Sequence, residues 1–183
     1  MKKILFIDPV STRPYRLDPS EPAPLGGTEA TLLRVAGGLS RRGHRIWISQ
    51  SAREATETDL QGIAYIPFRF RERLDCPRPD VVVCLRSHKV LPWLRREFAG
   101  CPLYLWLHCF PGTRRKCIRT MSREHDFHVV AVSQSHARFI ENRCGVRPIV
   151  IYNPLESGLE RYRTLSKDRN SLIFFSSPHK GLS

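Results

Sequence analysis

The sequence predicts an α/β domain built on a doubly wound, mostly parallel β-sheet of about seven strands. Short apolar runs rich in β-branched and aromatic residues alternate along the chain with helical or turn segments. This alternation is typical of buried parallel strands joined by crossover helices. The chain has 183 residues, of which 41% are hydrophobic, which is enough for one well-buried domain and too little for two complete ones. One hydrophobic core is therefore expected.

Each predicted strand is a short apolar run that lies between helical or turn segments. In chain order, the strands are expected over residues 4–7, 45–49, 64–67, 81–85, 103–107, 129–132 and 149–152. Because successive runs are separated by segments long enough for a crossover, the strands are expected to lie parallel. In such a sheet, ligands collect at the carboxyl ends of the strands.

Three helices are expected between the strands, over residues 28–42, 90–98 and 133–145. The first begins at Thr28, whose hydroxyl is expected to cap free amide groups, and it ends at Gly43 in a left-handed conformation. The third begins near Ser133 or Ser135 and runs to a glycine at its end. The polar segment 156–170 has no clear strand period, and it reads either as an interdomain linker or as a connecting helix.

The composition is strongly basic, with 30 Lys and Arg against 17 Asp and Glu and a net charge of +13. This charge favours polyanionic neighbours, such as nucleic acid, anionic lipid or phosphorylated ligands, but it does not choose among them. The basic residues are scattered along the chain, and no nucleic-acid-binding module is recognisable. No specific nucleic-acid partner is therefore expected.

The cysteines and the N-terminal residues indicate a reduced, cytoplasmic protein. The six cysteines form no CxxC pair and no Cys/His cluster with zinc spacing, so no structural metal is expected. Cys84 and Cys101 are predicted to be buried thiols. The apolar run at residues 4–7 is too short for the core of a signal peptide, and no stretch approaches the length of a membrane span.

The loop after the first strand ends in LGGTEATLL and carries the first candidate binding residues. Gly26 and Gly27 have no side chains, so the backbone there can approach a ligand closely. Thr28 opens a helix whose first amides and dipole favour an anion. The pattern is neither a dinucleotide-binding GxGxxG nor a P-loop, and a plain turn accounts for the two glycines about as well.

Further polar side chains follow the carboxyl ends of the later strands. These are Arg86 and Ser87 after the fourth strand, His108 and Arg114 after the fifth, Ser133 after the sixth, and Asn153 after the seventh. A single histidine at a strand end is usually a structural residue. Several polar residues on one rim of one sheet indicate a binding site there.

The order of these elements resembles that of family-four-type retaining glycosyltransferases of the GT-B fold. The run GGTEATLLRVAGGLSRRGHRIWI is similar to the glycine-rich loop, first helix and second strand of that family. GCPLYLWLH is similar to its strand ending in His, DFHVVAVSQS to its aspartate-strand-serine segment, and GVRPIVIYNPL to its last N-terminal strand and hinge. The resemblance covers nearly the whole chain and keeps the order of the motifs.

The resemblance implies an enzyme with two Rossmann-like domains, of which the N-terminal one mostly binds the acceptor. It implies that Gly26 and Gly27 approach the donor diphosphate or sugar, and that His108, the catalytic candidate, lies beside the reacting sugar. Ser133 matches a polar position near the cleft. Lys180 matches the lysine that neutralises the departing diphosphate, a role that suits a positioned ammonium group. Nucleotide-sugar and sugar acceptor are the implied substrates, without a metal or other cofactor.

Several positions depart from the family's pattern. Cys109 stands where an aspartate commonly follows the histidine, and Pro154 stiffens a hinge that is often Asn-Gly. Ser176 and Ser177 replace the usual Gly-Arg pair of the phosphate loop, so that Lys180 lacks its arginine partner. The Glu-x7-Glu pair that holds the donor has no counterpart in the expected position. Glu21 and Glu29 have that spacing by coincidence, because they lie on the first N-terminal loop.

The predicted organisation is a Rossmann-like acceptor-side domain at residues 1–155, a linker at 156–170, and a stub of the donor-binding domain at 171–183. We expect the chain alone to be inactive as a transferase, because the resemblance places most donor contacts in the other half. The apolar run 172–175 would be a strand without its own sheet, and it is expected to be disordered, to pack on the first domain, or to pair with another copy in a homodimer.

Two other functions are compatible with the charge of the chain. In the first, a non-catalytic docking module binds an anionic membrane surface or a phosphorylated glycan carrier through segment 91–98, with Trp93 and Phe98 at the interface, so that the protein is peripheral at the inner face of the membrane. The alternative for this segment is a surface helix that packs on the sheet. In the second, residues 68–74 bind nucleic acid; the alternative for them is a loop over the rim of the sheet.

Overall fold

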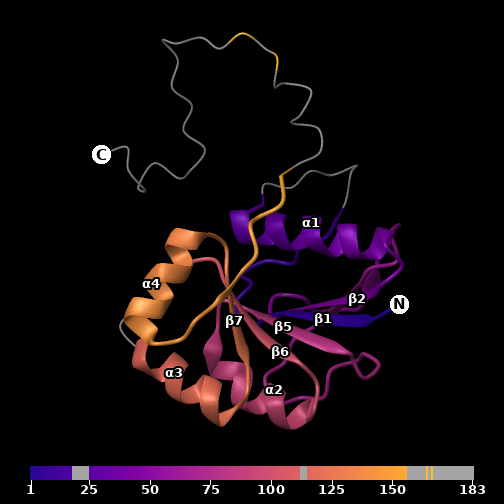
Figure 1. Cartoon of the computed structure of the whole chain (residues 1–183). Coiled ribbons are helices and arrows are strands. Elements are labelled where there is room, and N and C mark those ends of the chain that lie inside the picture. The colour runs from indigo at the N-terminus through magenta and orange to yellow at the C-terminus, as the bar shows by residue number, and fades with distance from the viewer. Residues whose placement is uncertain (18–24, 112–114, 156–163, 165, 167–183) are drawn as a thin grey trace.

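A computed structural model describes residues 1–17, 25–111, 115–155, 164 and 166, and it shows an α/β fold with a mostly parallel, eight-stranded sheet (Figure 1). The strands are β1 (Lys3–Asp8), β2 (Arg45–Gln50), β3 (Glu57–Thr58), β4 (Ala64–Pro67), β5 (Val81–Leu85), β6 (Leu103–Leu107), β7 (His128–Ala131) and β8 (Ile149–Val150). The helices are α1 (Gly27–Arg41), α2 (Leu91–Glu97), α3 (Arg115–Glu124) and α4 (Gln134–Cys144), and a 3-10 turn, η1 (His88–Val90), precedes α2. The predicted fold class is confirmed.

The strand order is β3-β4-β2-β1-β5-β6-β7-β8, and every pair except β3 and β4 is parallel. The chain leaves β1 toward β2 on one side and returns to β5 on the other side. In an open parallel sheet, such a reversal of strand order opens a crevice at the carboxyl ends of the two central strands. The crevice between the ends of β1 and β5 is therefore the expected place for a ligand.

The sheet separates two hydrophobic clusters. On one face, α1 packs Leu32, Leu33 and Ala36 against residues such as Phe6 and Ile48. On the other face lie α2, α3 and α4, whose apolar side chains pack against the alternate residues of the strands. Because both faces of the central strands are covered, these strands read as continuous apolar runs rather than as alternating ones.

One strand and one helix were not predicted from the sequence. Strand β3 consists of two exposed polar residues that pair antiparallel with β4 at the edge of the sheet, so it has no apolar signal. Helix α3 is rich in basic residues, and of its described side chains only Ile118 is fully buried. Both depend on pairing or packing with neighbours that the local sequence does not reveal.

The start of α1 corrects a further expectation. Gly26 is the N-cap residue, and no side chain caps the helix there, so the Thr28 hydroxyl does not have the predicted capping role. The ends of α1 and α4 do agree with the prediction: Gly43 has φ 81° and Gly145 has φ 68°. Both φ values lie in the left-handed region that glycine adopts without strain.

Segment 91–98 is a helical segment packed on the sheet, as one of its two interpretations held. Trp93 and Phe98 are only 8% and 7% exposed, so neither ring is accessible at a membrane interface.

Residues 68–74 form a loop after β4, as expected. Within the described ranges, no helix is long and apolar enough to cross a membrane. Cys84 and Cys101 are buried free thiols, as predicted.

Candidate functional site

The expected crevice lies at the carboxyl ends of β1 and β5, the two strands that flank the switch point. Asp8 is the last residue of β1, and it is completely buried. Arg86 is the first residue after β5, and its backbone amide donates a hydrogen bond to the carbonyl of Trp106 on β6. These two elements therefore place a carboxylate and a guanidinium side by side at the carboxyl edge of the sheet.

Arg86 has a strained backbone. Its φ is 62°, in the left-handed region, and the amide of Ser87 donates a 2.6 Å hydrogen bond to the carbonyl of Leu85. This bond across one residue is that of a tight γ-turn centred on Arg86, which is a rare and strained conformation for a residue with a side chain. The turn redirects the chain at the strand end, where the Arg86 side chain reaches Asp8 and Glu29.

The guanidinium of Arg86 bridges two carboxylates from different elements. Its Nη2 lies 2.5 Å from Oδ2 of Asp8, and its Nη1 lies 3.0 Å from Oε1 of Glu29 on α1. Burial disfavours the charged guanidinium, but the hydrogen bond and charge of Asp8, with a further contribution from Glu29, raise the pKa of Arg86 above its usual value. The network ties β1, β5 and the first turn of α1 together.

Tyr15 is the second side chain that binds the Asp8 carboxylate. Its hydroxyl donates a 2.9 Å hydrogen bond to Oδ2 of Asp8, and burial, followed by the charge of Asp8, raises the pKa of Tyr15 far above its usual value. The backbone of Tyr15 is held by Gln50 and by Arg53, whose side chains bind its carbonyl at 2.7 and 3.2 Å. Arg53 is only 4% exposed. It therefore fixes the loop that delivers the tyrosine.

Glu29 also explains why a glycine precedes α1. The Glu29 carboxylate folds back over Gly26 and occupies the space that a Cβ atom would need there. This puts a negative charge beside the free amides of the helix N-terminus, where the helix dipole stabilises it. An incoming anion at this end of α1 would have to displace or rearrange the Glu29 side chain.

His108 lies directly after β6, at the same edge of the sheet. Its ring packs on Trp106 with 4.6 Å between the ring centroids. Burial, followed by the nearby charge of Arg86, lowers the pKa of His108 to about 4, although Glu29 and Asp8 act in the opposite direction. His108 is therefore neutral near pH 7, and it can accept or donate a hydrogen bond without carrying charge.

Three buried nitrogen atoms around His108 lack a hydrogen-bond partner among the described residues. They are Nε2 of His108, Nε1 of Trp106 and Nε of Arg86. Unpaired buried polar groups are rare in folded proteins because each costs free energy. The indole and guanidinium nitrogens can only donate a hydrogen bond.

His136, on α4, supports the segment after His108. Its Nε2 lies 3.1 Å from the carbonyl oxygen of Cys109, and burial lowers the pKa of His136. Because a carbonyl oxygen only accepts, Nε2 is the protonated nitrogen of the neutral ring. Phe110 packs edge-on against the same ring. The hydrogen bond to Cys109 and the ring contact with Phe110 fix the path of the chain after His108.

The structure brings together five of the predicted site residues at this crevice or its margin: Gly26, Gly27, Arg86, Ser87 and His108. Thr28 lies partly buried in the first turn of α1. Asn153 lies after β8 and is exposed. Arg114, Lys180 and the run 172–175 lie outside the described residues, as does the linker 156–170 except for residues 164 and 166.

Ser133 has a clear structural role at the end of β7. It is the N-cap of α4, and its hydroxyl accepts a 3.1 Å hydrogen bond from the amide of His136. We expect Ser133→Ala to lower the free energy of unfolding by about 1 kcal/mol, as measured by urea denaturation. Ser135→Ala is the matched control, since the Ser135 hydroxyl contacts the Ser133 hydroxyl at 3.0 Å rather than a helix amide. An equal effect of both substitutions would contradict the capping role.

Four residues of the crevice were not identified from the sequence: Asp8, Tyr15, Glu29 and His136. Asp8 had a usable signal, because it directly follows the first apolar run, as His108 follows the fifth. The other three lie on a loop or on helices, and only the fold brings them to the crevice. In the described parts of the chain, no cluster of three His, Cys, Asp or Glu side chains could hold a metal ion.

No protein-family model matches the chain, and no curated protein matches it.

Proposed function

We propose that this chain is the acceptor-binding half of a retaining glycosyltransferase that uses a nucleotide-sugar donor. The proposal is supported most by the unpaired nitrogen of neutral His108, which lies with the Arg86–Glu29 ion pair at the switch point of the sheet. Sugar hydroxyl groups both donate and accept hydrogen bonds. A neutral imidazole, a carboxylate and unpaired N–H donors match that requirement.

The roles of the residues follow from the proposal. His108 and Arg86 contact hydroxyl groups of the acceptor or of the reacting sugar, and Glu29 accepts from a hydroxyl. Gly26 and the amides at the start of α1 lie on the donor side, where a diphosphate would replace the Glu29 carboxylate. Lys180, with other basic groups, would stabilise the departing diphosphate without a metal ion. The transferred sugar would be a hexose, and its anomeric configuration would be retained.

Binding of simple saccharides tests the acceptor role. We expect saturation-transfer NMR, with the methyl glycosides of glucose, galactose, mannose and N-acetylglucosamine as probes, to detect millimolar binding of at least one. His108→Phe keeps a ring on Trp106 and removes both nitrogens, and it is expected to weaken that binding by about tenfold. His128→Phe, at the exposed ring that packs on Tyr104, is the matched control. Binding that is absent, or equal in both variants, would overturn the proposal.

The donor side is tested separately by calorimetry. Because the resemblance assigns the nucleoside contacts to the other half of such enzymes, we expect no micromolar binding of a UDP-sugar or GDP-sugar series by this chain. Micromolar binding would contradict the assignment of the chain to the acceptor half.

The proposal places the protein in the cytoplasm.

A further inference from the structure

Phe110 is an aromatic residue two positions after His108, and it is 63% exposed. Cα atoms two residues apart in a chain are at most about 7 Å from each other, so Phe110 lies at the same carboxyl edge of the sheet as His108. Most of its surface is therefore open to solvent beside the proposed sugar site.

The ring of Phe110 is held by two rings of α4. Its centroid lies 5.3 Å from that of His136 and 4.6 Å from that of Phe139, and both contacts are edge-to-face. The contact of His136 with the carbonyl of Cys109 also fixes the backbone of the preceding residue. Because packing against two neighbouring rings restricts its orientation, Phe110 presents a fixed aromatic surface.

His136 also relates Phe110 to His108 in space. Besides burial and the charge of Arg86, a positive charge on His136 would lower the pKa of His108, which requires the two imidazole rings to lie near each other. Phe110 packs on the same His136 ring. A ligand that hydrogen-bonds to Nε2 of His108 therefore has the Phe110 ring close by.

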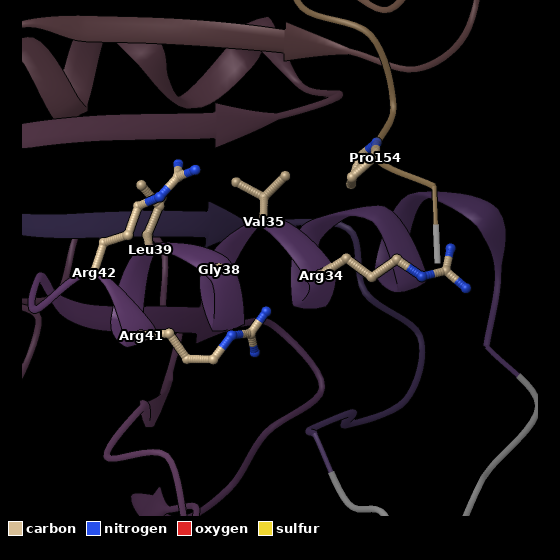
Figure 2. A pocket seen from close by; sticks show the side chains of 7 residues that line it. All are labelled: Arg34, Val35, Gly38, Leu39, Arg41, Arg42 and Pro154. Atoms are coloured by element: carbon tan, nitrogen blue, oxygen red, sulfur yellow. The ribbon is translucent and has the colours of Figure 1, made fainter. Parts of the chain in front are cut away.

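The groove beside α1 is another surface on which a longer ligand could continue. Its lining includes Val35 and Pro154 (Figure 2). None of its lining residues takes part in the contacts of Arg86 or His108 described above. The groove therefore belongs to a separate part of the surface, and Phe110 is the candidate for a contact beyond the first sugar.

The chemistry of an exposed aromatic ring suits the face of a sugar ring. The face of an aromatic ring carries partial negative charge, whereas the C–H groups on one face of a pyranose are apolar and slightly positive. A pyranose that stacks on Phe110 would remove exposed apolar surface from water. Ligand sites generally combine such apolar contacts with a few polar groups, and His108 supplies a polar group here.

We propose that Phe110 is the stacking platform for a second pyranose ring of the acceptor. The acceptor is then a disaccharide or a longer glycan: His108 contacts its first ring, and Phe110 determines the preference for a glycan that continues beyond it. This inference rests on the proposed sugar-binding role of His108.

Saccharides of one and two rings test the proposal with the full-length chain. The probes are the methyl glycosides of glucose, galactose, mannose and N-acetylglucosamine, and those of cellobiose, maltose, lactose, mannobiose and chitobiose. In NMR titrations, we expect at least one disaccharide to bind about tenfold more tightly than any of the monosaccharides. The C–H protons of its second ring should shift upfield on binding, because they lie over the face of an aromatic ring.

Substitutions assign the tighter binding to Phe110. Phe110→Ala is expected to remove the tenfold gain and to leave monosaccharide binding unchanged, whereas Phe110→Trp, which keeps an aromatic ring, should retain the gain. Phe70→Ala is the matched control, because Phe70 is 49% exposed and also packs edge-on against another ring, that of Trp93. Phe70 follows β4, which lies four strands from β6, or about 19 Å, so its substitution should change neither affinity.

The outcomes separate the stacking role from the sugar site itself. If monosaccharides bind and disaccharides bind no more tightly, or if the gain survives Phe110→Ala, the stacking role is overturned and the sugar site is not. If no saccharide binds, both are overturned. If uridine or guanosine monophosphate binds instead, and Phe110→Ala abolishes that binding, the ring stacks on a nucleobase and the proposed second sugar is overturned.

Discussion

Replacing Asp8 by alanine is expected to lower the free energy of unfolding by about 3 kcal/mol. The carboxylate is completely buried, and it is the common partner of the Arg86 guanidinium and the Tyr15 hydroxyl. Its removal leaves a half-buried positive charge with only Glu29 nearby, and it also leaves a buried hydroxyl without its acceptor. Breaking one side of a buried ion pair is costly because the remaining charge loses its compensation.

Urea denaturation followed by circular dichroism measures this loss. Glu57→Gln is the matched control, since the Glu57 side chain is 45% exposed and glutamine still offers an oxygen atom to Arg16 and Arg53; it should cost less than about 1 kcal/mol. In the double variant Asp8→Asn, Arg86→Met, the guanidinium that Asp8 compensates is removed as well, and Glu29 keeps the stabilisation of the α1 N-terminus, so part of the stability should return. If Asp8→Ala were as stable as Glu57→Gln, the buried network would not hold the crevice together.

Most strands of the sheet could be predicted because each is a short, continuous apolar run in the sequence. A run such as residues 103–107 is buried on both faces, and burial on both faces requires a continuous apolar sequence. The helix ends at Gly43 and Gly145 could be predicted for a similar local reason, since the left-handed conformation selects glycine. Strand β3 could not, because its backbone pairing with β4 involves two exposed polar residues.

The site could be predicted only where the strand ends define it. His108 and Arg86 directly follow apolar runs, so their place at the carboxyl edge follows from the parallel sheet. The ion pair of Glu29 with Arg86 depends on the angle at which α1 crosses the strands. The position of Tyr15 depends on the hydrogen bonds that Gln50 and Arg53 donate to its carbonyl oxygen. Such long-range geometry leaves no pattern in the local sequence.

The second large effect is expected from pH, through His108. The pKa of its imidazole is about 4 in the folded chain, against an ordinary value of 6.5. Between these two values the unfolded chain binds a proton that the folded chain does not bind. The contribution of His108 to stability is therefore present above pH 6.5, and it is lost as the pH falls toward 4. Between pH 7 and about pH 4.5, the free energy of unfolding should fall by about 2 kcal/mol on this account.

His108→Phe isolates the contribution of this residue from that of all other titrating groups. His136, whose pKa burial also lowers, and the carboxylates are present in both proteins, so they cancel in the difference between the two pH profiles. The variant should lose about 2 kcal/mol less stability than the wild type over this range, and NMR titration of the His108 ring should give its pKa directly. Parallel pH profiles would mean that His108 is charged as readily as a free histidine. Its buried Nε2 would then not be the neutral, unpaired group on which the proposed sugar contact depends.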